Sequence, residues 1–140
     1  MTAIANANPG QKAKSAPIKV LIVDDSQIVC ERLRSMLTEI DKVDVRLANQ
    51  DAQAVVALLQ QALPDVVILD LMLEDGPTFR LIRDAKSIDP DITVIVLTNY
   101  AFNSYRQKCL AKGADYFFDK SSEFDQVVDI IEQMRCAEAD

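Results

Sequence analysis

Apolar side chains along this sequence follow two alternating patterns, short continuous runs and longer stretches with helical spacing. Ile18–Val23 is a nearly continuous apolar run, which is typical of a strand buried on both faces of a sheet. Over residues 26–40 the apolar positions recur every three or four residues, which predicts an amphipathic helix. The alternation then repeats along the chain. We predict strands at 18–23, 43–48, 66–69, 92–97 and 114–118, and helices at 26–40, 51–63, 77–88 and 101–112 and from residue 122 onward.

Proline and glycine mark several of the predicted helix ends. Pro64 ends the second predicted helix, because proline cannot donate a helical hydrogen bond. Pro77 suits the first turn of the third helix, and Gly113 suits the position just after the end of the fourth. Ser122 and Asp125 have a spacing that resembles a capping box at the start of the last helix.

The alternation of five strands with five helices predicts an α/β fold, with a doubly wound, five-stranded parallel sheet and helices on both faces. The length of 140 residues suits one domain. We assign residues 17–136 to this domain, residues 1–16 to a disordered N-terminal arm of small and polar residues, and residues 137–140 to a C-terminal tail. We expect no output domain after the last helix.

The composition narrows the possible functions. No apolar run approaches the roughly 18–20 residues that span a bilayer, and residues 1–17 lack the apolar core of a signal peptide. We therefore expect a cytoplasmic protein with no membrane contact. The net charge of -7 would repel a phosphate backbone, which argues against direct nucleic-acid binding.

The types of reactive side chain narrow the chemistry further. The absence of histidine excludes His-based triads and imidazole metal ligands. Three cysteines without a Cys-x-x-Cys pair argue against a disulfide framework or a zinc site. Cys30 and Cys109 are expected to pack as small apolar side chains. Chemistry on this chain must therefore use carboxylates, hydroxyls and amines.

Polar side chains lie at the ends of four predicted strands. Asp24 and Asp25 follow the first strand, Asp70 follows the third, Thr98 lies at the end of the fourth, and Lys120 follows the fifth. Ligands of open α/β sheets bind outside the carboxyl ends of the strands, so we expect these side chains to meet at one edge. Each residue alone has an ordinary structural explanation, such as a helix cap for the Asp pair or a solvated lysine. Their joint occurrence at four strand ends favours a functional site.

Three carboxylates at one edge would repel one another unless a cation compensates their charge. Oxygen ligands suit Mg²⁺ better than zinc or copper. With a cation bound, Lys120 and Thr98 can contact a phosphoryl group, and one carboxylate is left as the nucleophile that forms an aspartyl phosphate. The residues themselves therefore predict an Mg²⁺-dependent phosphoryl-transfer site.

Four segments that carry these residues resemble the receiver domains of bacterial two-component response regulators. They are residues 19–26 (KVLIVDDS), 65–73 (DVVILDLML), 94–98 (VIVLT) and 112–120 (KGADYFFDK), and the resemblance covers about residues 18–136. It implies the flavodoxin-like, receiver type of fold. By this resemblance Asp70 is the phosphoacceptor, Asp25 is a direct Mg²⁺ ligand, and Asp24 is an acidic partner that holds the metal largely through water.

The resemblance also implies a switch and a set of partners. The Met72 backbone carbonyl is a further metal ligand, and Thr98 and Phe117 form a switch pair whose hydroxyl moves toward the phosphate while the ring moves inward. The phosphoryl donor is a histidine kinase or a histidine phosphotransfer protein. The implied protein is a stand-alone, single-domain response regulator, not an enzyme that turns over other substrates. Its switched surface is expected to include Tyr105, Arg106, Lys108, Asp115 and Gln126.

Several positions depart from the family pattern, although none removes a required group. Glu74 and Ser121 stand where proline is usual, and Asn99 stands where a smaller residue is common. Met72 and Tyr100 occupy positions that face the attacking water in this family, and neither is a water-orienting carboxylate or amide. We therefore predict a long-lived phosphoryl group.

Other functions are compatible with parts of the same pattern. A phosphorelay intermediate or a phosphate sink would use the same site, whereas a pseudo-receiver that only binds partners would not need the complete set of residues. An aspartate-nucleophile phosphatase of the dehalogenase type would need a second aspartate where Met72 stands. A flavodoxin-like flavin binder would need a phosphate-cradling loop after the first strand, which this sequence lacks.

Overall fold

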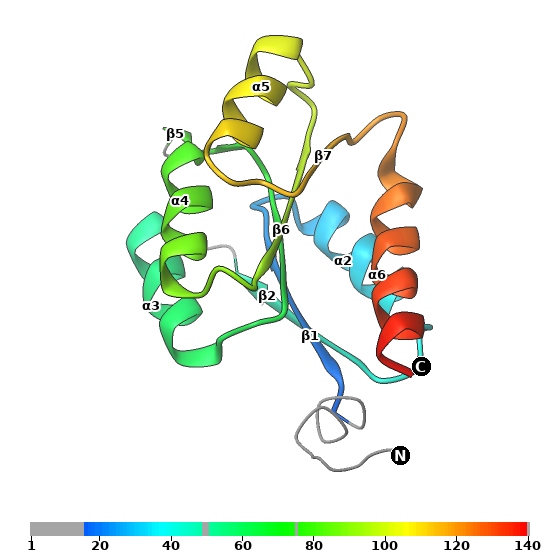
Figure 1. The fold of residues 1–140 in the computed structure, drawn as a ribbon. Coiled ribbons are helices and arrows are strands. Elements are labelled where there is room, and N and C mark those ends of the chain that lie inside the picture. The colour runs from blue at the N-terminus through cyan, green and yellow to red at the C-terminus, as the bar shows by residue number, and fades with distance from the viewer. Residues whose placement is uncertain (1–15, 49–50, 75, 140) are drawn as a thin grey trace.

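The computed structural model describes residues 16–48, 51–74 and 76–139, and residues 1–15 of the predicted arm lie outside the described residues. Five parallel strands form one sheet in the order β2-β1-β3-β6-β7 (Figure 1). The strands are β1 (Ile18–Val23), β2 (Val43–Ala48), β3 (Val66–Leu69), β6 (Thr93–Thr98) and β7 (Tyr116–Asp119). This sheet confirms the predicted doubly wound α/β fold.

Helices cover both faces of the sheet (Figure 1). One face carries α2 (Gln27–Leu37) and α6 (Phe124–Ala139), and the other carries α3 (Ala52–Ala62), α4 (Phe79–Ile88) and α5 (Asn103–Ala111). Strand β1 contributes side chains to the hydrophobic cores on both faces of the sheet. Val20 and Ile22 lie in the core under α2 and α6. Leu21 and Val23 lie in the core on the opposite face. Burial on both faces explains why this strand is apolar at nearly every position.

The strand register brings the predicted functional positions to one edge of the sheet. Val23 of β1 pairs with Leu69 of β3, and Leu69 pairs with Val96 of β6. Thr98, at the end of β6, pairs with Asp119 of β7. The residues after β1, β3 and β7 and the last residue of β6 therefore lie at the carboxyl edge, where ligands of such sheets bind.

Several helix ends have the capping residues that the sequence indicates. The Ser26 hydroxyl accepts a hydrogen bond from the Val29 N–H at the start of α2, and the Asp51 carboxylate accepts one from the Ala54 N–H at the start of α3. Gly113 follows α5 with a φ of 116°, a left-handed conformation that glycine adopts without strain. The prediction that Gly113 stops this helix is confirmed.

The third predicted helix begins later than the sequence indicates. The prediction that Pro77 lies in its first turn is wrong, because Gly76–Pro77 forms the short strand β5. This strand pairs antiparallel with β4 (Met72–Leu73), and Gly76, which pairs with Leu73, has a φ of 121° that glycine adopts without strain. Helix α4 starts only after this small hairpin has closed.

The last helix also differs from its prediction. It begins at Phe124 rather than at Ser122. Glu123, just before the helix, is hydrogen-bonded to Asp119 at both its side chain and its backbone. Its carboxylate accepts a hydrogen bond from the Asp119 N–H at 3.0 Å, and its own N–H donates to the Asp119 carbonyl oxygen at 2.8 Å. The helix continues to residue 139, beyond the boundary at residue 136 that the sequence suggested. Among the described residues, no helix has the length and apolar character needed to cross a bilayer.

Candidate functional site

Three carboxylates meet at the carboxyl edge of the sheet. Asp24 and Asp25 follow β1, and Asp70 follows β3. One carboxylate oxygen from each residue lies within 4.8 Å of those of the other two. Asp24 and Asp70 are buried, whereas Asp25 is exposed. The structure therefore brings these three predicted residues together, with one of them facing solvent.

The Lys120 ammonium lies between two of these carboxylates. Its Nζ is 2.7 Å from Asp24 Oδ2 and 3.0 Å from Asp70 Oδ2, and its side chain is only 8% exposed. Burial alone would lower the pKa of Lys120, but the hydrogen bond to Asp24 and the charges of Asp70 and Asp24 outweigh burial and raise this pKa above its ordinary value. Lys120 is therefore a cation at neutral pH.

Asp70 is held from two directions. Burial raises the pKa of its carboxyl group above the ordinary value, and the neighbouring Lys120 opposes that shift. The Met72 N–H donates to Asp70 Oδ1 at 3.3 Å, and the Thr78 hydroxyl donates to the Asp70 carbonyl oxygen at 2.8 Å. Both the side chain and the backbone of Asp70 are thus fixed by the hairpin that follows it.

Backbone N–H groups orient the other two carboxylates. The Ser26 N–H donates to Asp24 Oδ1 at 2.8 Å, and the Glu74 N–H donates to Asp25 Oδ2 at 2.9 Å. Glu74 stands where the resembling family usually has proline, which has no N–H to donate. The Cys30 thiol donates to the Asp24 carbonyl oxygen at 3.2 Å, and burial, followed by the charge of Asp24, raises the pKa of Cys30 to about 11.

This set of groups fits a hard divalent cation. Three carboxylates and one ammonium leave the cluster with an excess of negative charge, which a cation would compensate. Carboxylate oxygens are the ligands that Mg²⁺ prefers, and Mg²⁺ also keeps several of its waters. Because Asp25 is exposed, a hydrated cation can reach the cluster from solvent.

The predicted switch pair lies beside this cluster. Thr98 is fully buried, its hydroxyl accepts the Tyr100 N–H at 3.0 Å, and its carbonyl accepts the Lys120 N–H at 3.0 Å. Phe117 is 3% exposed, so its ring already lies inward. The Arg106 guanidinium lies 4.9 Å from the centroid of that ring and donates to the Phe117 carbonyl at 3.2 Å. Sequence reasoning placed Arg106 on the outer surface and missed this contact.

Other residues expected on the switched surface also make contacts within the fold. Tyr105 packs edge-on against both Phe79 and Phe102, with centroid distances of 5.9 Å and 5.6 Å. Asp115 forms an ion pair with Lys86 at 2.8 Å. These contacts connect α5 with α4, and the start of β7 with α4. Tyr105 and Asp115, both expected on the switched surface, are therefore in contact with α4.

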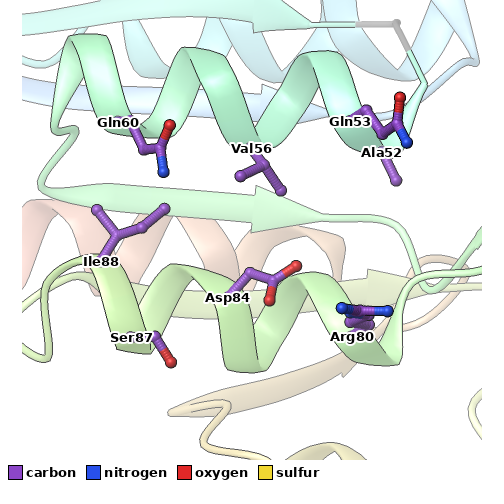
Figure 2. Close-up of a pocket in the computed structure, with 8 residues that line it drawn as sticks. All are labelled: Ala52, Gln53, Val56, Gln60, Arg80, Asp84, Ser87 and Ile88. Carbon is purple, nitrogen blue, oxygen red and sulfur yellow. The ribbon is translucent and has the colours of Figure 1, made fainter.

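An open groove of about 870 Å³ lies between α3 and α4. Figure 2 shows side chains of the two helices facing one another across it. Helix α3 contributes Gln53, Val56 and Gln60, and α4 contributes Arg80 and Asp84 among others. None of the residues that line this groove belongs to the carboxylate cluster, so the groove is separate from the candidate site.

Comparison with known proteins gives a consistent family. The sequence matches the response regulator receiver domain family over residues 20–132. It is 26% identical over 115 residues to the response regulator protein VraR of Staphylococcus saprophyticus, a match that covers 82% of this chain and 55% of that protein. It is 31% identical over 103 residues to the DNA-binding transcriptional activator DevR/DosR of Mycobacterium tuberculosis, a match that covers 74% and 48%, respectively. The chain spans about half the length of these curated relatives.

Solved structures share the fold. A CheY-like response regulator receiver domain protein from Methanospirillum hungatei superimposes with a TM-score of 0.77 at 22% identity, covering 88% of this chain and 97% of that one. A response regulator from Burkholderia pseudomallei, whose structure contains a phosphorylated aspartic acid, a calcium ion and citrate, superimposes with a TM-score of 0.70 at 21% identity, covering 87% and 75%.

Proposed function

Since this chain belongs to the response regulator receiver domain family, we propose that it accepts a phosphoryl group on Asp70 from a phosphohistidine donor and then presents a changed surface to another protein. The observation that supports this proposal most strongly is the buried Lys120 ammonium beside Asp70, within a cluster of three carboxylates. The Burkholderia pseudomallei structure, which holds a phosphorylated aspartic acid and a calcium ion, has the same fold and lends support.

The transfer step follows from the groups around Asp70. A carboxylate oxygen of Asp70 forms a bond to phosphorus while the P–N bond to the donor imidazole breaks, and the electron pair of that bond leaves with the imidazole nitrogen. Lys120, whose Nζ is 3.0 Å from Asp70, compensates charge on the phosphoryl oxygens. The Thr98 hydroxyl turns from its present contact with the Tyr100 N–H to donate to a phosphoryl oxygen.

The cation in this proposal is Mg²⁺. We assign Asp25, Asp70 and the Met72 carbonyl as its direct ligands and Asp24 as a partner that acts largely through water. Mg²⁺ supplies positive charge that neutralises the oxygens of the transferring group. The protein's own contribution is to hold the Asp70 carboxylate in one direction through the Met72 N–H and the Lys120 ammonium.

The output is a change at the surface formed by α5, β7 and α6. Movement of the Thr98 hydroxyl toward the phosphate changes the β6–α5 loop, because that hydroxyl now accepts the Tyr100 N–H. The Phe117 ring is already inward and is held there by Arg106. We therefore propose that phosphorylation acts mainly through the loop after Thr98 and stabilises a ring position that is populated beforehand.

The wider role is also a proposal. We propose that the protein acts in the cytoplasm through a receiver domain that begins at about residue 17 and includes all of α6. Its target is a protein rather than DNA, because the net charge of -7 would repel a phosphate backbone. DNA binding is named for the relative DevR/DosR, of which this chain matches about half. A phosphorelay intermediate or a phosphate sink would use the same transfer step.

A profile of phosphotransfer from the host's histidine kinases tests this function. Radiolabelled kinases should label the wild-type protein in the presence of Mg²⁺, and Asp70→Asn should stay unlabelled. The matched control is Asp44→Asn, an exposed aspartate of β2, which should be labelled like the wild type. Equal labelling of Asp70→Asn, or turnover of a phosphate ester by the wild type, would overturn the proposal.

We further propose that the phosphoryl group on Asp70 is long-lived. Tyr100 is about half exposed and lies two residues after the end of β6, and Met72 lies in the hairpin that follows Asp70. Neither side chain has a carboxylate or amide that could orient an attacking water. A time course of acyl-phosphate decay should extend over minutes or longer, and loss within seconds would contradict the proposal.

A further inference from the structure

Thr78 occupies the N-cap position of α4 but does not cap that helix. Threonine at this position usually accepts a hydrogen bond from a backbone N–H of the first turn, and here its side chain makes no such bond. Its hydroxyl instead donates to the carbonyl oxygen of Asp70 at 2.8 Å and to that of Leu71 at 3.1 Å. The side chain is 4% exposed, so these contacts are shielded from water. A buried polar contact of this kind is costly to lose.

Thr78 also forms a backbone hydrogen bond at the base of the β4–β5 hairpin. Its backbone N–H donates to the Leu71 carbonyl at 2.8 Å, directly next to the paired strands β4 and β5. Because threonine is branched at Cβ, few side-chain rotamers are open to it. The direction of the hydroxyl is therefore set by the backbone of the hairpin, and the Asp70 carbonyl is fixed relative to that backbone.

The same hairpin touches the carboxylate cluster at two further points. The Met72 N–H donates to Asp70 Oδ1 at 3.3 Å, and the Glu74 N–H donates to Asp25 Oδ2 at 2.9 Å. A shift of the hairpin would therefore move donors to two of the three carboxylates at once. Sites of this kind depend on ligand positions held to within roughly 0.5 Å.

We propose that Thr78 is a positioning residue for the phosphoacceptor site. Its buried hydroxyl holds the β4–β5 hairpin against the backbone of Asp70, so that Asp70 and Asp25 keep the spacing that a cation and a phosphoryl group require. This inference rests on the proposed function and deepens it. Removal of a group that orients metal ligands typically weakens metal binding 10- to 100-fold, and we expect a loss of about tenfold here.

Two variants of Thr78 distinguish the effect of its hydroxyl from that of its side-chain shape, and a third variant is the control. Thr78→Val keeps the shape and removes the hydroxyl, whereas Thr78→Ser keeps the hydroxyl. Thr38→Val is the matched control, because the Thr38 hydroxyl also donates to two backbone carbonyls, those of Arg34 at 2.8 Å and Ser35 at 3.2 Å, but does so at the exposed end of α2. If Thr78→Val does not fold, Thr78→Ala takes its place.

Three measurements on folded protein decide the proposal. Mg²⁺ affinity is measured by calorimetry, together with the backbone amide NMR shifts of residues 71–74 in the absence of phosphate. The rate of labelling by phosphoramidate is then measured at saturating Mg²⁺. We expect Thr78→Val to bind Mg²⁺ about tenfold more weakly, to change the amide shifts and to be labelled more slowly. Thr78→Ser and Thr38→Val should resemble the wild type.

Two results would overturn the positioning role. One is a folded Thr78→Val protein with the Mg²⁺ affinity and labelling rate of the wild type. The other is a Thr78→Ser protein as impaired as Thr78→Val, since the methyl group and not the hydroxyl would then be responsible. A wild-type protein that binds Mg²⁺ but takes no phosphate would refute the proposed function instead, and the Mg²⁺ affinities and amide shifts would still decide the role of Thr78.

Discussion

Replacing Lys120 by methionine removes the ammonium group that lies between Asp24 and Asp70 and keeps a side chain of similar length. The lost contacts are at 2.7 Å and 3.0 Å, and the side chain is 8% exposed. Without the ammonium, three carboxylates face one another with oxygens within 4.8 Å. At an effective dielectric constant of about 20, two unit charges at that separation repel by about 3 kcal/mol.

That repulsion is present in both proteins, and in the variant the ammonium no longer offsets it. Removal of one partner of a buried ion pair typically costs about 3–5 kcal/mol. We therefore expect the metal-free Lys120→Met protein to be about 3 kcal/mol less stable than the wild type at neutral pH. Mg²⁺ should restore more stability to the variant than it adds to the wild type. The reason is that Mg²⁺ relieves the carboxylate repulsion and, in the variant, does not compete with the ammonium for the same oxygens.

Urea unfolding followed by circular dichroism, with EDTA or with Mg²⁺, measures both effects. The control is Lys86→Met, which removes an ion pair with Asp115 at 2.8 Å whose side chains are 22% and 39% exposed. This pair is more exposed than the contacts of Lys120, so the control should lose less stability than Lys120→Met and gain nothing extra from Mg²⁺. A metal-free Lys120→Met protein as stable as the wild type would refute the reasoning, as would equal stabilisation of both proteins by Mg²⁺.

The pH dependence of the stability difference between the wild type and Lys120→Met follows from the pKa of Lys120. Its neighbours raise this pKa in the folded state, so the stability that Lys120 contributes is fully present below the ordinary lysine pKa of about 10.4. That stability is lost as the pH rises through the higher folded-state pKa. The gap between wild type and Lys120→Met should therefore stay constant from neutral pH to about pH 10 and narrow above it.

Two further predictions concern the cysteines and the aromatic switch residue. Burial raises the pKa of Cys30 and of Cys109 to about 11, whereas Cys136 is exposed. At pH 8 a thiol reagent should therefore label Cys136 rapidly and the other two only on unfolding, and labelling of all three at one rate would contradict their burial. Arg106→Ala removes the guanidinium from the ring and the carbonyl of Phe117, at a cost of about 1 kcal/mol. The ¹⁹F NMR signal of fluorinated Phe117 should then shift or broaden, and an unchanged signal would show that Arg106 does not hold the ring.

The sequence is sufficient to predict the sheet and the gathering of Asp24, Asp70 and Lys120 at one of its edges. Ile18–Val23 is apolar at every position except Lys19 because both faces of β1 are buried, and this pattern is typical of a strand in a parallel sheet. Parallel strands bring their carboxyl ends to one edge, so residues far apart in sequence, such as Asp24, Asp70 and Lys120, can be placed together without knowledge of any contact.

The loop after Asp70 could not be predicted in the same way. Pro77 has the local preferences of a first helical turn, but pairing of β5 with β4 places it in a hairpin. Thr78 likewise has the preferences of a helix cap, and the nearby carbonyl of Asp70 takes its hydroxyl instead. Arg106 has the sequence position of a surface residue, yet its long side chain folds back over a buried ring. Each of these outcomes depends on a partner outside the local sequence pattern.

Direct identification of the phosphorylated residue tests the central claim most sharply. The wild-type protein is incubated with phosphoramidate and Mg²⁺, the product is reduced with borohydride, which converts an aspartyl phosphate to homoserine, and the peptides are mapped by mass spectrometry. We predict homoserine at position 70 when Mg²⁺ is present and unmodified Asp70 when EDTA replaces it. Homoserine at position 24 or 25, or an unmodified chain in the presence of Mg²⁺, would contradict the assignment of Asp70 as the phosphoacceptor.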